Sequence, residues 1–294
     1  MPRVALIQFA PLEPHQGDAS LNLQRAHDLV RNAAQEGADL VTLPEYFLVP
    51  SSTSHATASH WLSSFQDLAR ELRVDIQVGT IVERATRRET RPVLENVASY
   101  IDWEGNVLHR YKKRNLWWPE KEYLCEGNED HQVFDTRFGR VGMLICWDLA
   151  WPRAFQSLLL QNVSLVLAPT YWTAVDAGPL GLKHNVHSEA DYLKVLIPTR
   201  AWDNECAIVF TNAGAPASWN EGDPIGNEEG RIGGSCVCVP FKGRIGGAKG
   251  PQEELVLVDL DLSILEDARK VYGVRRDLIT KLKQEEALPS WVVE

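Results

Sequence analysis

The order of strand-like and helix-like segments is the feature that most constrains the fold of this chain. Short apolar runs without helical spacing predict strands, and longer runs with apolar residues at helical spacing predict helices. The first half reads strand, helix, strand, helix, strand, strand, and the second half repeats this order. No Gly/Ser-rich or Pro-rich linker separates the two copies. Because helices alternate with strands, we predict an α/β domain built from two related halves, each with two helices on a mixed sheet.

The expected elements define the boundaries of this fold. In the first half, strands are expected at residues 4–10, 38–43, 74–82, 95–101 and 107–111, and helices between Asp18 and Gly37 and at 59–72. A Ser/Thr/His-rich loop is expected at 51–60 and a basic turn at 84–91. In the second half, strands are expected at residues 140–145, 164–168, 206–211, 234–239 and 255–262, and helices at 152–160 and 188–203. If the two sheets pack face to face, the result is a four-layer α-β-β-α sandwich. We expect one domain over residues 1–294, in which the tail 262–294 is suited to a subunit contact.

Composition excludes several classes of function. The 294 residues are 44% hydrophobic and 24% charged, as in an ordinary globular protein, and the net charge is −10. A general nucleic-acid or anionic-membrane binder needs a basic patch, so neither kind of partner is expected. No apolar run approaches the roughly 20 residues that span a bilayer. The net charge says little else about partners.

Cysteine usage bears on location and on metal binding. The five cysteines are an odd number in a long chain, which fits a reducing compartment better than a disulfide framework. Residues 1–8 pass straight into a strand-like run without the apolar block of a signal peptide, so we expect a cytoplasmic protein. No CxxC, HExxH or His-rich spacing indicates a zinc site, and no metal or organic cofactor is expected.

One cysteine stands at a position that is typical of nucleophiles. Cys146 ends the apolar run 141–145, and Pro152 then opens a helix. Nucleophiles of other α/β hydrolases lie at such a strand-to-helix turn, and a helix N-terminus there is expected to favour the reactive thiolate. A buried strand-end cysteine that acts as a small hydrophobe is the alternative interpretation.

Two further polar residues also fall at strand ends. Glu45 follows Pro44 after the strand 38–43, and Lys113 follows the strand 107–111. Ligands gather at the carboxyl ends of strands in open α/β sheets, so these residues and Cys146 are predicted to meet. A carboxylate takes the thiol proton and an ammonium stabilises an oxyanion, so the set is chemically coherent. Taken singly, each charge also fits a solvated surface position.

These segments resemble the three catalytic motifs of the nitrilase superfamily of carbon–nitrogen hydrolases. The matching stretches, in the family's chain order, are Leu43-Pro44-Glu45-Tyr46, Lys113-Arg114-Asn115-Leu116 and Leu144-Ile145-Cys146-Trp147-Asp148. Stretches outside the site are also similar, at residues 200–205, 211–214, 234–240 and 259–262. The resemblance covers nearly the whole chain.

The resemblance assigns a role to each motif residue. It implies that Glu45 is the general base, Cys146 the nucleophile, and Lys113 the stabiliser of the tetrahedral oxyanion, with help from the backbone N–H of Trp147. Lys113, and not Lys112, keeps the family's spacing to Asn115-Leu116. Family members often carry a second glutamate that positions the substrate. Glu120 is the best match for it, with Glu122 as the rival.

The implied activity is hydrolysis of a non-peptide carbon–nitrogen bond through a thioester acyl-enzyme. The sequence Cys146-Trp147-Asp148 favours a linear amide or an N-carbamoyl compound, because nitrilases usually have Cys-Trp-Glu. The runner-up is a nitrilase acting on an organic nitrile. A nitrilase-like fold kept as a non-catalytic binding scaffold is the third reading, weakened by the presence of all three motif residues. Family members also usually form dimers or larger assemblies, so a homo-oligomer is implied.

Departures from the family pattern follow the cysteine. Related amidases often place an arginine where Ala150 stands, a glutamate where Arg153 stands, and a further arginine where Gln156 stands. The contacts of that loop must therefore be rebuilt, which leaves the subfamily open.

Aromatic residues near the motifs are candidates for the substrate pocket. Trp117, Trp147, Tyr171 and Trp172 are expected to line it, since aromatics suit an apolar or aromatic acyl group. Core or subunit-interface positions are the alternative for any one of them. The loop 178–187, with Lys183 and His184, either presents a cation to a substrate carboxylate or is a surface loop.

Overall fold

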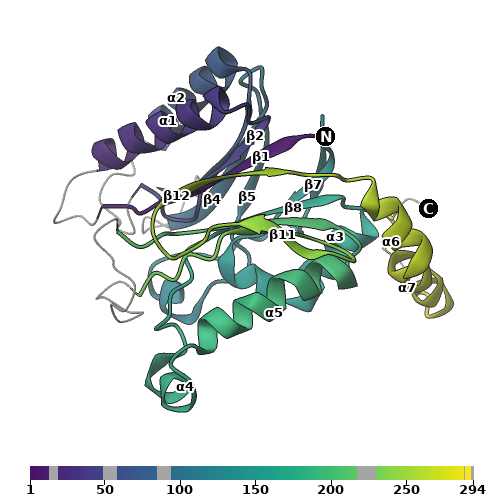
Figure 1. The fold of residues 1–294 in the computed structure, drawn as a ribbon. Coiled ribbons are helices and arrows are strands. Elements are labelled where there is room, and N and C mark those ends of the chain that lie inside the picture. Colours follow the sequence, from purple (N-terminus) through teal and green to yellow (C-terminus); the bar gives the residue numbers. More distant parts are fainter. Residues whose placement is uncertain (13–18, 49–57, 85–93, 217–229, 288, 293–294) are drawn as a thin grey trace.

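Two six-stranded sheets pack face to face, with helices on both outer surfaces (Figure 1). The computed structural model describes residues 1–294 except 13–18, 49–57, 85–93, 217–229, 288 and 293–294. Helices α1 (Ala19–Gln35) and α2 (Ala58–Leu72) cover the first sheet, and α3 (Pro152–Leu160) and α5 (Ser188–Asp203) cover the second. The predicted four-layer α-β-β-α sandwich with mixed sheets is confirmed.

The first sheet has the strand order β12-β1-β2-β3-β4-β5. Its strands are β1 (Arg3–Gln8), β2 (Leu40–Thr42), β3 (Asp75–Arg84), β4 (Leu94–Ile101), β5 (Val107–Lys112) and β12 (Glu254–Asp259). The strands β1, β2 and β3 are parallel, and the two outer pairs, β3 with β4 and β4 with β5, are antiparallel. The two reversals leave β5 running in the same direction as β2, so both strands end at the same edge.

The second sheet repeats this plan with the order β11-β10-β9-β8-β7-β6. Its strands are β6 (Val133–Thr136), β7 (Gly139–Met143), β8 (Leu165–Thr170), β9 (Ala207–Asn212), β10 (Cys236–Val239) and β11 (Gly243–Gly247). The strands β7, β8 and β9 are parallel, and β6 pairs with β7 as β12 pairs with β1, antiparallel at the edge. The strand β12 follows the whole second sheet in sequence, so the C-terminal part of the chain supplies an edge strand of the first sheet.

Burial on both faces explains why the central strands are continuously apolar. In β1, Val4 and Leu6 join the core between the sheets, while Ala5 and Ile7 join the core under α1 and α2. The sheets are also joined by a hydrogen bond of 2.7 Å between the hydroxyls of Thr42 and Thr211.

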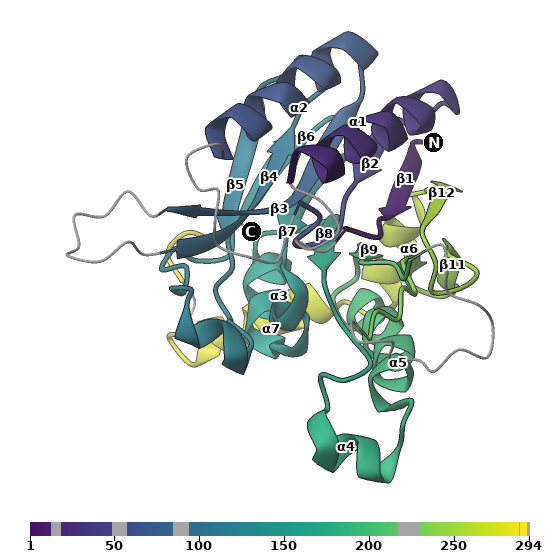
Figure 2. The ribbon, with the colours of Figure 1, turned by 90° about the vertical axis from the view of Figure 1, so that its left-hand side faces the viewer.

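Several elements differ from the sequence-based expectations. The strands β6 and β11 and the helices α4 (Gly178–His184) and α7 (Val274–Gln284) were not predicted. The prediction of a loop at 178–187 is wrong in part, because α4 forms over most of this range. The helix projects away from the sandwich (Figure 2). The expected loop at 51–60 and the basic turn at 84–91 lie almost entirely outside the described residues.

The tail packs on its own chain through α6 (Ile264–Val271) and α7. Leu265 and Ala268 of α6 and Ile279 of α7 are buried. Two tail arginines donate hydrogen bonds to carbonyl oxygens near the end of α3, Arg269 to Val163 at 3.1 Å and Arg275 to Leu159 at 3.1 Å. Within the described residues, no helix has the length and apolar character that crossing a membrane requires.

Candidate active site

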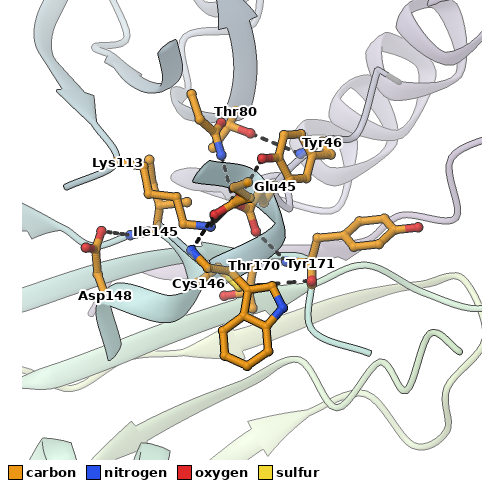
Figure 3. Close-up of polar contacts among 12 residues, drawn as sticks. Glu45, Tyr46, Thr80, Lys113, Ile145, Cys146, Asp148, Thr170 and Tyr171 are labelled. Atoms are coloured by element: carbon orange, nitrogen blue, oxygen red, sulfur yellow. Dashed lines mark hydrogen bonds and ion pairs between the residues drawn. The ribbon is translucent and has the colours of Figure 1, made fainter. Parts of the chain in front are cut away.

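Three polar side chains from the two sheets converge at one edge of the sandwich (Figure 3). Glu45 follows β2, Lys113 follows β5, and Cys146 begins a 3-10 turn, η3 (Cys146–Ala150), just after β7. All three are buried, with exposed fractions of 1%, 1% and 7%. The Nζ atom of Lys113 lies 2.8 Å from Oε1 of Glu45. The structure therefore brings together the three residues that the sequence singled out.

The carboxylate of Glu45 is held by donors from three other segments. Its Oε1 accepts from the side-chain amide of Asn96 at 2.8 Å and from Lys113, and its Oε2 accepts from the N–H of Tyr171 at 2.9 Å. Burial raises the pKa of Glu45 to about 7, although the Lys113 charge and contact with the Cys146 thiol partly oppose that shift. The carboxylate is thus fixed and titrates near neutrality.

Close packing of β3 against Pro44 fixes the position of the next residue, Glu45. At Gly79 of β3, a Cβ atom would lie 2.0 Å from the carbonyl oxygen of Pro44, so only glycine permits this approach. Tyr46 adopts a φ of 55°, in the left-handed region, and its N–H donates to the Thr80 hydroxyl at 3.0 Å. The backbone strain is localised at the residue beside the carboxylate.

Lys113 is a buried cation between two carboxylates. Its ammonium group lies 2.8 Å from Glu120 as well as 2.8 Å from Glu45. Burial alone lowers the pKa of Lys113, but the carboxylates of Glu45 and Glu120 raise it well above its ordinary value. An ammonium has three N–H donors, so one remains for another acceptor.

The position of Glu120 distinguishes it from its rival, Glu122. Glu120 is buried in the 3-10 turn η2 (Trp118–Glu122), where its carboxylate also accepts from the N–H of Trp117 at 2.7 Å and from the hydroxyl of Tyr46. Glu122 is exposed. Among the two candidates for the second glutamate, the structure brings only Glu120 to the site.

The rejected lysine also lies elsewhere. Lys112 is half-buried and forms an ion pair of 2.9 Å with Glu95, on the other side of its strand from Lys113.

Cys146 has a strained backbone and a protonated thiol. Its φ is 47°, in the left-handed region that non-glycine residues rarely adopt. Burial, followed by the charge of Glu45, raises the pKa of the Cys146 thiol well above its ordinary value. The expectation that a helix N-terminus favours the thiolate is therefore wrong. The turn η3 separates Cys146 from α3, and burial together with the charge of Glu45 outweighs the favourable charge of Lys113.

Asp148 fastens the cysteine turn to the lysine segment. Its buried carboxylate accepts from the N–H of Ile145 at 3.0 Å, the N–H and side chain of Asn115 at 2.9 and 2.7 Å, and the hydroxyl of Tyr111 at 2.8 Å. Four donors therefore fix the segment before Cys146 against the residues on both sides of Lys113. Sequence reasoning used Asp148 only as a marker of the substrate class and missed this contact.

The altered loop after the cysteine is held from the neighbouring helix. Arg200 of α5 donates to the carbonyl oxygens of Leu149 and Ala150 at 3.1 and 3.2 Å and lies over the ring of Phe155. Arg200 thus supplies contacts to the loop in which Ala150, Arg153 and Gln156 depart from the family pattern.

A cavity of about 180 Å³ opens onto the cysteine. Its described lining comprises Tyr46, Trp117, Pro119, Glu120, Tyr123, Cys146, Trp147, Tyr171, Trp172, Thr173 and Asp176. All four aromatic residues proposed for the pocket therefore lie in its wall. Lys183 and His184 do not, because both are exposed on α4.

Three further residues of the site were missed at the sequence level. Tyr46 stood in a recognised motif without a role, Asn96 lies in the middle of β4, and Asp176 follows the segment 170–172 that was expected to line the pocket. Of these, only Asp176 could have been predicted, because it is an acid that follows Tyr171 and Trp172, which were expected to line the pocket. Among the described residues, no group of three or more His, Cys, Asp or Glu side chains has the geometry of a metal site.

The sequence profile of the carbon–nitrogen hydrolase family matches residues 3–270 of this chain. The chain therefore belongs to that family, and the resemblance to the nitrilase superfamily is confirmed.

Individual relatives carry more than one activity in their names. An N-carbamoylputrescine amidase of Solanum lycopersicum is 26% identical over 285 residues, which cover 93% of this chain and 91% of the relative. A nitrilase of Pyrococcus abyssi is 25% identical over 283 residues, which cover 92% and 93%. The crystal structure of a carbon–nitrogen hydrolase from Helicobacter pylori G27 is similar with a TM-score of 0.79 and 19% identity, over 94% of each chain, and shows the same fold.

Proposed function

We propose that this carbon–nitrogen hydrolase cleaves a linear amide or an N-carbamoyl compound through a thioester on Cys146. The observation that carries the proposal is the buried ammonium of Lys113, at 2.8 Å from both Glu45 and Glu120, beside a cysteine that opens into an aromatic cavity. This arrangement supports the assignment of a base, a nucleophile and an oxyanion stabiliser around one reacting carbon.

The first half-reaction transfers the acyl group to the enzyme. Glu45 takes the proton of the Cys146 thiol as sulfur attacks the carbonyl carbon, and the carbonyl electrons move to oxygen. The third N–H of Lys113 and the backbone N–H of Trp147 stabilise that oxyanion. When the intermediate collapses, the C–N bond breaks and the leaving nitrogen takes the proton from Glu45. The products are an amine or ammonia and a thioester.

The second half-reaction uses the same groups. Glu45 takes a proton from water, whose oxygen attacks the thioester carbon, and the sulfur leaves and recovers the proton. Glu120 positions the substrate and, through its contact with Lys113, orients the ammonium. This chemistry requires no metal or organic cofactor, so EDTA is expected to leave turnover unchanged.

The amide or carbamoyl substrate class is supported by two observations. Asp148 follows Trp147 where nitrilases usually have glutamate, and a relative that covers nearly the whole chain is named for an N-carbamoyl substrate. A nitrile remains the second candidate, supported by the relative named as a nitrilase. It would be attacked by the same thiol, and it differs in forming a thioimidate first.

The variant Cys146→Ala tests the proposal directly. We expect it to lose turnover by at least about a thousandfold on any amide or carbamoyl substrate, because the nucleophile is gone. Alanine is as compatible as cysteine with the strained φ at this position, so far-UV circular dichroism should be unchanged. Cys125→Ala, at a half-buried cysteine away from the site, is the matched control and should keep full activity.

The outcome separates the three readings. Retained turnover in Cys146→Ala would end the thioester mechanism. A panel of amides, carbamoyl amines and nitriles, read by ammonia release and by intact mass for a trapped adduct, distinguishes amidase from nitrilase. If no compound is turned over and iodoacetamide labels Cys146 no faster than the other cysteines, the scaffold reading gains.

A further inference from the structure

Asp176 is an acidic residue in the lining of the catalytic cavity. Among the described residues that line it, two carry a carboxylate, Glu120 and Asp176. Glu120 lies 2.8 Å from the ammonium of Lys113, so its charge is balanced inside the protein. Within the described chain, Asp176 has no ion pair with a basic side chain, and its carboxylate is bonded to Thr173 alone. Among the described lining residues, Asp176 is therefore the carboxylate that has no ion pair with a basic side chain.

The geometry of Asp176 is fixed before any ligand arrives. The N–H and the hydroxyl of Thr173 donate to its two oxygens at 2.8 and 2.7 Å. A carboxylate has about four acceptor sites, so about two remain for a ligand. Asp176 also lies near enough to Cys146 to contribute to the raised pKa of that thiol. A ligand at Asp176 and an acyl group at Cys146 would therefore share one cavity.

The cavity wall is suited to a cation as well. The indole rings of Trp117, Trp147 and Trp172 form a continuous row, with centroids 4.4 and 5.5 Å apart. Aromatic faces attract ammonium groups through their quadrupole, by about 0.5–2 kcal/mol depending on desolvation. An acid and aromatic rings in the wall of one cavity are a typical environment for a protonated amine.

Among the described residues, the lining of the cavity includes no Lys, Arg or His that could pair with a substrate carboxylate. Lys183 and His184 are exposed on α4 and do not line the cavity. Arg231 lies behind the cavity wall, where it donates to the hydroxyl of Tyr171 at 3.1 Å and to the carbonyl oxygen of Pro11 at 3.0 Å. Neither group offers its charge to the interior, so an anionic substrate end would face Asp176 unbalanced.

We propose that the preferred substrate carries a protonated amine at the end remote from the scissile C–N bond, and that Asp176 is the residue that binds it. This inference rests on the proposed function and names the substrate class for the same site. The ammonium donates to the free acceptor sites of Asp176 while its carbon chain lies along the indole row. Asp176 is a specificity-determining residue and takes no part in bond breaking.

Binding to a protein that cannot turn over tests the inference. In Cys146→Ser, we would measure by calorimetry the affinity for three N-carbamoyl compounds matched in length: N-carbamoyl-1,4-diaminobutane, neutral N-carbamoylbutylamine and anionic N-carbamoyl-4-aminobutyrate. Homologues with three and five methylenes complete the series. We expect the cation to bind at least about tenfold more tightly than the neutral compound, as for a charge-assisted hydrogen bond, and the anion to bind most weakly.

Adding Asp176→Asn separates recognition from a structural role. Asparagine keeps the size and one acceptor for Thr173 but removes the charge, so the preference for cation over neutral compound should fall to within about twofold. Asp191→Asn removes the same charge from an exposed position on α5 and should retain the preference. An equal loss of affinity for all three compounds in Asp176→Asn would instead indicate a purely structural role and overturn the inference.

The outcomes are distinct from those of the proposed function. If no cation in the series binds more tightly than its neutral homologue, the inference is wrong even where amides are hydrolysed. If Cys146→Ala keeps turnover, the thioester mechanism is wrong, and the binding series still decides whether Asp176 selects cations.

Discussion

Burial of charge dominates the site at the scale of single residues. One ammonium, that of Lys113, lies between the carboxylates of Glu45 and Glu120 with almost no exposure to solvent. Isolated buried charges cost several kcal/mol each, so such a cluster persists only when its members are paired and bonded. Burial in this cluster raises the pKa of Glu45 to about 7.

The raised pKa of Glu45 predicts how activity depends on pH. The carboxyl must be ionised to accept the thiol proton, and burial raises its pKa to about 7. Below that pH the group is protonated, so kcat/KM should fall as pH decreases through about 7 and reach a plateau above it. The rate at which iodoacetamide alkylates Cys146 should follow the same limb, and Glu45→Gln should remove the limb. A flat alkylation profile between pH 5 and 8 in the wild type would contradict the assignment of the base.

Loss of the buried cation should affect both turnover and folding. In Lys113→Ala, the oxyanion loses its donor, and two carboxylates remain buried without a counter-charge. We therefore expect turnover to fall by more than about a hundredfold and the free energy of unfolding at pH 8 to fall by about 3 kcal/mol, as for other broken buried pairs.

Urea denaturation at pH 8 and pH 5 checks this prediction. Protonation of the orphaned carboxylates should make the loss smaller at pH 5. Lys112→Ala, the neighbouring half-buried lysine paired with Glu95, is the control and should cost under about 1 kcal/mol. Equal stability losses in the two variants would refute the argument from burial.

At the scale of elements, strand ends and a tied turn build the site. The strands β2 and β5 end at the same edge, which places Glu45 beside Lys113, and β7 of the other sheet delivers Cys146 from across the interface. The turn η3 then keeps Cys146 at a φ of 47°. A strained residue persists only where its surroundings hold it, and Asp148 supplies four of the hydrogen bonds that do so.

Asp148→Asn tests the importance of that turn. The amide puts an NH2 group where two donors now point, so at least one bond is replaced by a clash of donors. We expect the free energy of unfolding to fall by about 2 kcal/mol or more, and kcat to fall more than KM rises, because the cysteine loses its position. The exposed Asp135→Asn, on β6, should change neither quantity. Unchanged kcat with reduced stability would show that the turn is merely structural.

At the scale of the whole molecule, the first sheet takes strands from both ends of the chain. The strand β12 pairs with β1 over six residues, from Arg3 with Asp259 to Gln8 with Glu254. The two sheets share one core, to which β1 contributes Val4 and Leu6. The first half therefore lacks the edge strand of its own sheet, and residues of both sheets form the core between them.

This dependence predicts cooperative unfolding of residues 1–294 as a single domain. Tryptophan fluorescence and far-UV circular dichroism should give coincident urea transitions, because a half cannot remain folded when β12 leaves β1. Two separate transitions would contradict the single-domain prediction.

The assembly state remains a prediction of the family resemblance. We expect a homodimer or larger homo-oligomer, with the tail 262–294 as a candidate contact region. Multi-angle light scattering of the purified protein should give at least 66 kDa, twice the 33.0 kDa of one chain. A particle of 33 kDa at micromolar concentration would refute the prediction.

Local sequence patterns were sufficient for the layers and for the central residues of the site. Apolar runs reveal strands buried on both faces, and their order along the chain limits the possible topologies. Glu45, Lys113 and Cys146 were predictable because each stands at a strand end, where an open α/β sheet gathers its ligands. Short elements such as β6, β11 and α4 escaped prediction, because they have too few residues for a clear periodic signal.

Tertiary structure alone decided the electrostatics of the site. The sequence suggested a thiolate at Cys146 and a cation from Lys183 or His184, yet the fold gives a protonated thiol and an acid, Asp176, in the cavity wall. Burial and the distances between residues far apart in sequence set these properties, and neither is encoded in a local pattern. The sequence by itself determined which residues meet, and the packing of two sheets determined how their charges act on one another.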